Sequence, residues 1–168
     1  MVSTRSPLIF FDRLPAYVRN KDGLPVPLDD CRRELVVANG CFDLLTVGHL
    51  KVLRTAASLA PYLLVAINSD VSVRSLKGPD RPFVPQEERA QLVASLCWVD
   101  AVAVFDGEEA LERLLAHVRP AYLVKGAGSG PTPGAQHAGA VVYVPQALTL
   151  STTQLAERIR RTATERIN

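Results

Sequence analysis

The chain has few cysteines and lacks the sequence features of several classes of protein. Only three cysteines occur in 168 residues and none forms a CxxC pair, so neither a disulfide framework nor a zinc cluster is indicated. We therefore expect a reducing compartment and a cytoplasmic location. No segment approaches the roughly 20 apolar residues of a membrane-spanning helix. Asp12, Arg13 and Pro15 interrupt the apolar run near the N-terminus, so no signal peptide is expected.

The chain also lacks a large excess of either charge. Its 19 basic and 17 acidic residues leave a net charge of +2, too small to indicate a general nucleic-acid or membrane-surface binder. No GxGxxG follows a strand and no GxxxxGK[ST] is present, which argues against a dehydrogenase and a P-loop kinase. Any anion-binding site must therefore be local.

Short apolar runs alternate with helical patterns from Leu35 onward. Strands are predicted at 34–38, 62–68, 101–105, 121–125 and 141–144, because these runs are short and rich in β-branched residues. Helices are predicted over 48–59, from Pro85, from Asp106 and from Ser151. The last two starts carry capping-box patterns, Asp106 with Glu109 and Ser151 with Gln154.

This alternation predicts an α/β fold class: a single doubly wound, Rossmann-like domain with a mostly parallel five-stranded sheet, over residues 34–168. Residues 1–33 carry four prolines and no sustained period, so they are expected to form an N-terminal arm or a short extra element. The stretch 126–139, with five glycines and two prolines, is typical of a mobile loop that closes over a ligand.

The segment 38–53, ANGCFDLLTVGHLKVL, is the most informative about chemistry. A buried strand leads through a glycine-containing turn into a helix, and ligands of open parallel sheets bind at the carboxyl ends of strands. The helix start favours phosphate, Gly48 permits close approach, and Thr46 and His49 are hydrogen-bond donors. The same residues also suit an ordinary helix start with a Thr46 cap and a surface His49. The residues alone leave both interpretations open.

The motif NGCFDLLTVGH resembles the H/TxGH signature of the nucleotidylyltransferase superfamily, whose turn holds a triphosphate and whose second histidine stabilises the reacting α-phosphate. Residues 67–100, LVKG (123–126) and STTQL (151–155) match in order the heptose-phosphate adenylyltransferases and the glycerol-3-phosphate cytidylyltransferases. The resemblance covers about residues 36–159. It implies an enzyme that transfers a nucleoside monophosphate from ATP or CTP to a small phosphorylated acceptor, such as heptose 1-phosphate, and releases pyrophosphate. It also implies Mg²⁺ as cofactor and a homodimer.

The same resemblance implies roles for individual residues. Those implied to be catalytic are Thr46, His49, Lys77 in the loop after the second strand, and Arg89, which would reach the β- and γ-phosphates. Those implied to bind nucleotide are Asn39, Gly40, Cys41, Phe42, Asp43, Gly48, Lys125, Gly126, Ser151, Thr152 and Thr153. Those implied to bind the acceptor are Asn68, Asp70 and Arg81. No residue is assigned as a metal ligand.

Two positions depart from the heptose-enzyme pattern. Thr46 stands where the heptose and glycerol enzymes usually have histidine, although the phosphopantetheine adenylyltransferases use TxGH. Gly128 stands where the heptose enzymes typically carry an aspartate. Two alternatives follow: a cytidylyltransferase acting on glycerol 3-phosphate or a hydroxyethylphosphonate-type acceptor, and a nucleotide-binding regulatory module that has lost turnover.

Overall fold

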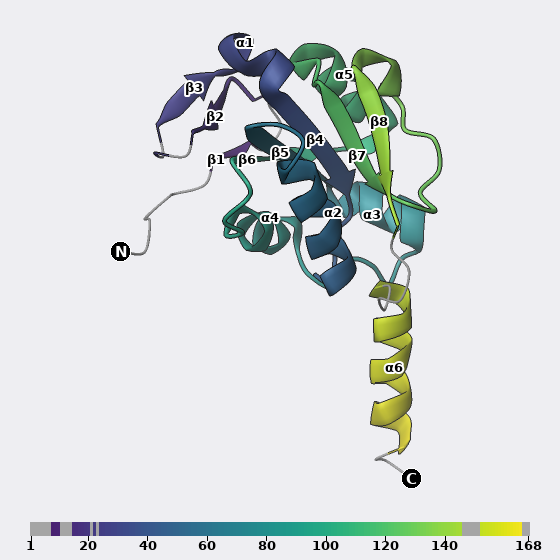
Figure 1. Ribbon diagram of the computed structural model, residues 1–168. Coiled ribbons are helices and arrows are strands. Elements are labelled where there is room, and N and C mark those ends of the chain that lie inside the picture. Colours follow the sequence, from purple (N-terminus) through teal and green to yellow (C-terminus); the bar gives the residue numbers. More distant parts are fainter. Residues whose placement is uncertain (1–7, 11–14, 21, 23, 146–151, 166–168) are drawn as a thin grey trace.

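A six-stranded sheet forms the centre of the molecule (Figure 1), in a computed structural model that describes residues 8–10, 15–20, 22, 24–145 and 152–165. Its strands are β1 (Leu8–Phe10), β4 (Leu35–Gly40), β5 (Tyr62–Asn68), β6 (Ala101–Phe105), β7 (Tyr122–Gly126) and β8 (Ala140–Val144). Their order is β1-β6-β5-β4-β7-β8, and every neighbouring pair is parallel. The predicted α/β class and the five predicted strands are confirmed.

The sheet contains one strand more than predicted. Residues of β1 pair with Ala101–Ala103 of β6 and extend the sheet at that edge. Three residues are too few to show the period-two alternation by which a strand is recognised in a sequence. A separate antiparallel pair, β2 (Tyr17–Arg19) and β3 (Pro25–Pro27), precedes α1 (Leu28–Cys31) and the 3-10 helix η1 (Arg32–Glu34).

Helices join the parallel strands, because a parallel connection must cross from one end of the sheet to the other. They are α2 (Val47–Ala57), α3 (Asp70–Lys77), α4 (Gln86–Ala94) and α5 (Gly107–Val118). A 3-10 helix, η2 (Ala135–His137), precedes β8, and α6 (Thr152–Glu165) follows it. The sequence predicted α2, α4, α5 and α6 but not α3.

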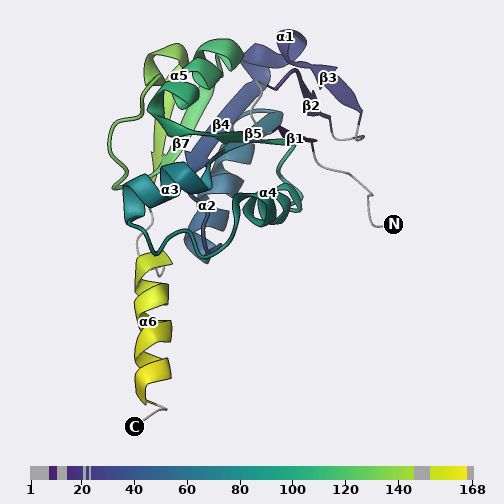
Figure 2. The same ribbon diagram turned by 180° about the vertical axis from the view of Figure 1, so that it is seen from behind.

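Two apolar layers pack on the sheet (Figures 1 and 2). On one face Leu53 of α2 and Val93 of α4 are fully buried against the strands. On the other face Leu115 of α5 is fully buried. Because helices cover both faces of the sheet, the central strands consist almost entirely of apolar residues. Val37, for example, is fully buried and pairs with Leu64 on one side and Leu123 on the other. Each such side chain stabilises the fold by roughly 1.5–3 kcal/mol.

The strand order reverses beside β4. The chain runs β4, β5, β6 toward one edge and then returns to place β7 on the other side of β4. In open α/β sheets this switch point leaves a crevice at the carboxyl ends of the strands, where ligands bind. The turn after β4 and the last residues of β7 both lie there.

Helix α6 leads away from the sheet in both views (Figures 1 and 2). Within the described residues, no helix is long and apolar enough to cross a bilayer.

Candidate active site

A cavity of about 980 Å³ opens where β4, β5, β6 and β7 end. It is lined by most of the residues predicted for the site: Asn39, Gly40, Cys41, Phe42, Asp43, Thr46, Gly48, His49, Asn68, Lys77, Arg81, Lys125, Gly126, Thr152 and Thr153. Asp70 and Arg89 are not among the lining residues. Ser151, together with its predicted capping box, lies outside the described residues.

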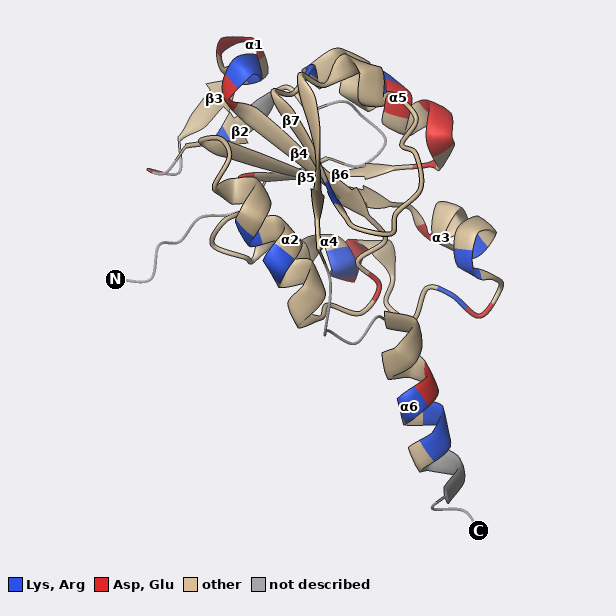
Figure 3. Ribbon diagram, turned by 45° about the vertical axis from the view of Figure 1, so that its right-hand side comes forward, with Lys and Arg blue, Asp and Glu red and all other residues tan. Residues whose placement is uncertain are grey.

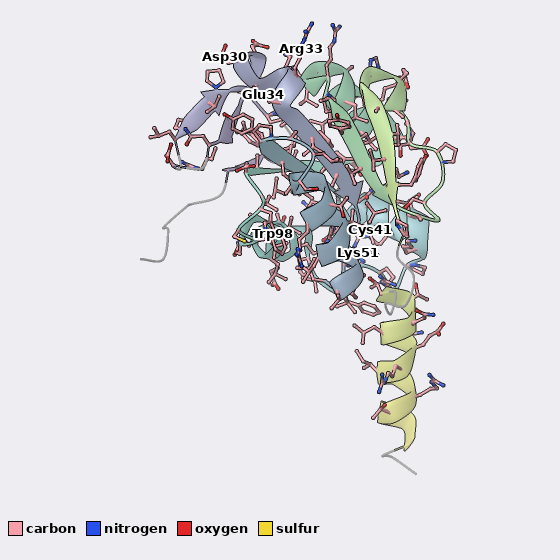
Figure 4. The ribbon with its side chains drawn as sticks, in the orientation of Figure 1. Asp30, Arg33, Glu34, Cys41, Lys51 and Trp98 are labelled. Atoms are coloured by element: carbon pink, nitrogen blue, oxygen red, sulfur yellow. The ribbon has the colours of Figure 1, made fainter. Side chains whose placement is uncertain are left out.

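The conformation of the turn after β4 depends on Gly40 and Phe42. Phe42 has φ of 50° and is 4% exposed, so its ring packs inward beneath the turn. A Cβ at Gly40 would lie 3.2 Å from Phe42 Cε2, tighter than ordinary carbon contacts. Glycine at position 40 therefore lets the strand end directly against the ring. Figure 4 shows Cys41 at this end of β4, with Asp30, Arg33 and Glu34 at the opposite end.

Helix α2 begins immediately after this turn, with Thr46 as its cap and His49 in its first turn. The Thr46 backbone N–H donates to His49 Nδ1 at 3.1 Å, so Nδ1 must be unprotonated and the neutral ring carries its proton on Nε2. Burial lowers the pKa of His49 below its ordinary 6.5. His49 is therefore a neutral donor in the cavity wall, with Nε2–H left for a ligand.

Asp43 joins this turn to residues 81–84. Its buried carboxylate accepts from Arg81 Nε at 2.5 Å, from the Phe83 N–H at 2.7 Å and from the Val84 N–H at 3.1 Å. The Arg81 guanidinium also lies 4.5 Å from the centre of the Phe83 ring. Asp43 thus orients two parts of the cavity wall, and it offsets the charge that Arg81 would otherwise offer to a ligand.

Arg89 occupies a different place from the one predicted. It is fully buried, and it donates from Nε to Val84 O, from Nη1 to Cys41 O and Asn68 O, and from Nη2 to Asp70. These bonds use four of the five N–H groups of the guanidinium, and the buried side chain does not line the cavity. The sequence showed only that Arg89 follows PQEE on a helix, whereas the fold turns this face of α4 beneath the carboxyl ends of β4 and β5.

Asp70 is also placed differently from the acceptor-binding role predicted for it. It is the first residue of α3; its carboxylate lies 2.7 Å from Arg89 Nη2 and its N–H donates to Gln86 Oε1 at 2.9 Å. Helix α3 begins directly after β5 and turns this side chain toward α4. Asn68 remains at the cavity, and its Nδ2 donates to Ser72 Oγ at 2.8 Å.

Two lysines bring positive charge to the cavity. Lys77 is the last residue of α3, rather than a loop residue as predicted; it is exposed and makes no ion pair among the described residues. Lys125, near the end of β7, is 7% exposed and donates from Nζ to Gly130 O at 2.6 Å. Burial lowers the pKa of Lys125. In the described part of the chain no carboxylate pairs with it, so an anionic ligand would supply the missing counter-charge.

Residues 126–133 of the predicted loop line the cavity, and part of the remaining segment, 134–139, is regular. Helix η2 occupies Ala135–His137, and Gly134, with φ of 81°, packs on α5. A Cβ at Gly134 would lie 2.8 Å from Glu112 Cα, which real side chains do not tolerate. The loop is therefore docked on α5 at a position that only glycine fits.

The first turn of α6 completes the lining. Thr152 Oγ1 donates to Leu44 O at 3.3 Å, and Thr152 and Thr153 both face the cavity. Their hydroxyls lie at a helix start, where backbone amides favour an anion.

The prediction for Asp106 was wrong in one respect. Asp106 precedes α5, but it makes no side-chain cap bond; Oδ1 instead accepts from Ser69 Oγ at 2.6 Å. Asp106 and Glu108 both line the cavity, and the sequence did not indicate either as a site residue. The signal was present, because Asp106 directly follows a predicted strand at the same sheet edge.

Comparison with known proteins places the chain in a family. The profile of the family described as "Cytidylyltransferase-like" matches residues 37–157. Two curated relatives, both called bifunctional protein HldE, come from Koribacter versatilis and Syntrophotalea carbinolica. The first is 48% identical over 131 residues, which are 74% of this chain and 26% of the relative. The second is 40% identical over 151 residues, which are 84% of this chain and 31% of the relative. This chain thus spans between a quarter and a third of their length.

A solved structure confirms the fold. The lipopolysaccharide core biosynthesis protein from Thermoplasma volcanium superposes with a TM-score of 0.56 at 22% identity, covering 66% of this chain and 94% of that protein. The family match, the relatives and the fold agree. The chain belongs to the cytidylyltransferase-like family and is a nucleotidyltransferase.

Proposed function

We propose that the chain transfers a nucleoside monophosphate from a nucleoside triphosphate to the phosphate of a small acceptor. One observation supports this proposal: Lys77, Lys125 and the neutral imidazole of His49 all line the cavity at the start of α2. A helix start and two cations attract polyphosphate, and a neutral imidazole donor stabilises charge on a phosphoryl oxygen without adding a like charge to the lysines.

The reaction needs no covalent enzyme intermediate. An acceptor phosphate oxygen attacks the α-phosphorus of the triphosphate and forms a new P–O bond. The bond from the α-phosphorus to the bridging oxygen of the β-phosphate breaks, and pyrophosphate leaves with that electron pair. His49 Nε2–H would donate to the α-phosphoryl oxygen, while Lys77 and Lys125 would hold the two anionic reactants close to each other.

The nucleotide would contact the turn after β4 and the start of α6. Gly40 and Gly48 permit close approach of backbone to phosphate, and Thr152 and Thr153 add hydroxyl donors. Lys125 and Gly126 would contact the nucleotide from β7. Asn68 and Arg81 would face the acceptor. We assign Arg89, Asp70 and Asp43 to positioning, since their polar atoms hold the wall segments together.

Members of the family generally use a divalent metal ion, and we propose Mg²⁺. Among the described residues no group of three His, Cys, Asp or Glu side chains could hold a metal, and Asp43 is already paired with Arg81. This fits Mg²⁺, which is usually held by substrate phosphates, water and one or two carboxylates. When bound, it would neutralise charge on the triphosphate.

We propose ATP and a sugar phosphate such as heptose 1-phosphate as substrates, on the resemblance to the heptose-phosphate adenylyltransferases. CTP with glycerol 3-phosphate or a hydroxyethylphosphonate-type acceptor is the alternative that Thr46 and Gly128 keep open. A cytoplasmic location fits three free cysteines. A homodimer also belongs to this proposal, and the exposed Val141 and Tyr143 of the outer strand β8 support an intermolecular contact.

The test is pyrophosphate release, measured with ATP and CTP against heptose 1-phosphate, glycerol 3-phosphate and hydroxyethylphosphonate. We expect one pair to release pyrophosphate in the wild type and a His49→Ala variant to lose most of the rate. His137→Ala is the matched control, because His137 lies outside the cavity lining. Nucleotide binding without release under every pair would reject the proposal and favour the regulatory module.

A further inference from the structure

Helix α3 forms one wall of the cavity, although little of it packs on the rest of the domain. Residues 71–72 and 75–77 line the cavity, but only Ser72 and Val73 of the helix are buried. Its last four residues, which end with Lys77, are all exposed. Helix α3 lies at the periphery of the molecule, and basic residues occur along it (Figure 3). Packing therefore holds only the first half of α3.

Hydrogen bonds join the start of α3 to α4, which packs on one face of the sheet. The Asp70 carboxylate lies 2.7 Å from Arg89 Nη2, and the Asp70 N–H donates to Gln86 Oε1 at 2.9 Å. Arg89 Nη1 also donates to Asn68 O, just before the helix, at 2.9 Å. Arg89 and Gln86 both belong to α4. These bonds fix one side of the start of α3.

Asp106 supplies a bond to the start of α3 from the other face of the sheet. It directly precedes α5, which covers that face, and its Oδ1 accepts from Ser69 Oγ at 2.6 Å. Ser69 is the cap of α3 and is 8% exposed; its hydroxyl oxygen accepts from the Ser72 N–H at 3.0 Å. The Ser69 N–H donates to Phe105 O at 2.8 Å. A charge-assisted hydrogen bond thus joins the end of β6 to the cap of α3.

The direction of α3 decides where Lys77 lies. Lys77 follows Asp70 by seven positions, which is roughly 10 Å along a helix axis at about 1.5 Å per residue. A tilt of about 10° at the first turn would therefore move the far end by roughly 2 Å. Gly78 follows Lys77 with φ of 101° and open space where a Cβ would lie. Packing at that end does not oppose the tilt.

We propose that Asp106 is a positioning residue for the reaction: through Ser69 it sets the direction of α3 and thereby holds Lys77 at the reacting phosphates. Asp106 makes no side-chain cap bond with α5, so that helix does not account for its carboxylate. A carboxylate in a cavity for anionic reactants also repels them, whereas its bond to Ser69 explains its place there. This inference rests on the proposed function, because Lys77 acts in that reaction.

The test measures pyrophosphate release by two variants of Asp106, with the substrate pair that the wild type uses. Asp106→Ala removes the bond to Ser69, and we expect kcat/KM to fall about tenfold, because a small misplacement of Lys77 weakens its hold on the phosphates. Asp106→Asn keeps an oxygen that accepts from Ser69 and loses only the charge, so it should retain at least the wild-type value. Equal losses in the two variants, or no loss in Asp106→Ala, would overturn the inference.

A double-mutant cycle with Lys77→Ala shows whether Asp106 acts through Lys77. When Lys77 is absent, adding Asp106→Ala should lower kcat/KM by less than about twofold, because no side chain remains to be misplaced. A further loss of about tenfold would show that Asp106 acts directly or through general stability, and would refute the inference. Glu109→Ala is the matched control, since Glu109 is 94% exposed and lies outside the cavity lining; it should leave kcat/KM unchanged.

Hydrogen exchange follows α3 independently of activity. In Asp106→Ala the backbone N–H groups of residues 73–77 should exchange faster than in wild type, while those of α4 stay unchanged. Unchanged exchange in α3 would contradict the inference.

If the wild type releases no pyrophosphate with any pair, the proposed function fails, and calorimetric titration with ATP and CTP decides whether Asp106 presents Lys77 to phosphate. Weaker binding by Asp106→Ala than by Asp106→Asn supports the inference. Equal binding by the two variants, or no binding by the wild type, refutes it.

Discussion

Replacement of Arg89 by methionine distinguishes a residue that holds the site together from one that binds phosphate. The guanidinium of Arg89 is fully buried and makes hydrogen bonds to Val84 O, Cys41 O and Asn68 O, and an ion pair with Asp70. Methionine fills similar space but leaves three carbonyl groups and one carboxylate without this donor. Breaking a buried charge pair costs about 3–5 kcal/mol.

The lower part of that range applies here, because the Asp70 side chain is 25% exposed and water can solvate the stranded carboxylate. We therefore expect Arg89→Met to lower the free energy of unfolding by about 3 kcal/mol, a large part of the 5–15 kcal/mol typical of a domain. Pyrophosphate release should fall as well, since Cys41 and Asn68 would no longer be fixed. Adding Asp70→Asn should recover part of the stability by removing the unpaired charge.

Urea unfolding followed by the fluorescence of Trp98 measures this effect. Trp98 is the chain's one tryptophan; it packs against the apolar layer beside α4 (Figure 4). Arg113→Met is the matched control, because Arg113 is 66% exposed and its pair with Glu109 should contribute less than about 1 kcal/mol. Stability within about 0.5 kcal/mol of wild type, together with a raised KM for the nucleotide, would show that Arg89 meets phosphate and that its place in the fold was misjudged.

Further predictions concern His49, Gly134 and Asp43. His49→Ala should reduce turnover roughly a hundredfold or more, equivalent to about 3 kcal/mol of transition-state stabilisation, and should lower the free energy of unfolding by only about 1 kcal/mol, because it also removes the acceptor of the Thr46 N–H; near-normal turnover would exclude the role. The pKa of His49 is lowered from 6.5, so its contribution to stability should be complete above pH 6.5 and decline as the pH falls toward the lowered value, where the unfolded chain binds the extra proton. Thermal unfolding of wild type and His49→Gln across this range checks the effect, and identical pH profiles would contradict it. Gly134→Ala should lower the unfolding temperature more than Gly128→Ala, because both have positive φ but only the former meets backbone, at 2.8 Å; equal shifts in a thermal melt would disprove the contact. Asp43→Asn should weaken the hold on residues 81–84 and speed their hydrogen exchange, whereas unchanged exchange would show that the Phe83 and Val84 amides are protected by other means.

The fold was predictable because its signals are local and repeated. Strands buried on both faces are short apolar runs, and the helices between them carry caps or periodic apolar residues, so β4 to β8 and α2, α4 and α5 could be located. Helix α3 was missed because DVSVRSLK follows a strand directly and buries only Ser72 and Val73, which gives no clear apolar stripe.

The side-chain partners could not be predicted in the same way. The resemblance identified Arg89 and Asp70, but their pairing depends on how α4 crosses below β4 and β5, a relation between residues 19 positions apart. His49 and Lys77 both line the cavity: the position of His49 at the helix start after the first strand pointed to this edge of the sheet, whereas Lys77 came from the resemblance alone. The sequence predicted Asp106 as a helix cap, and only the structure shows that its carboxylate instead accepts a hydrogen bond from Ser69.

Because Lys125 Nζ donates to Gly130 O, the glycine-rich loop and a phosphate ligand would both be acceptors for the same ammonium group. A phosphate bound at Lys125 would be a stronger acceptor for the ammonium group than this neutral carbonyl oxygen. If phosphate binding draws Lys125 away from Gly130, the backbone N–H groups of Gly128, Ser129, Gly130 and Thr132 should exchange faster with solvent when substrate is bound; Pro131 and Pro133 carry no N–H. The loop would then report occupancy at β7 even where no atom of the ligand reaches it.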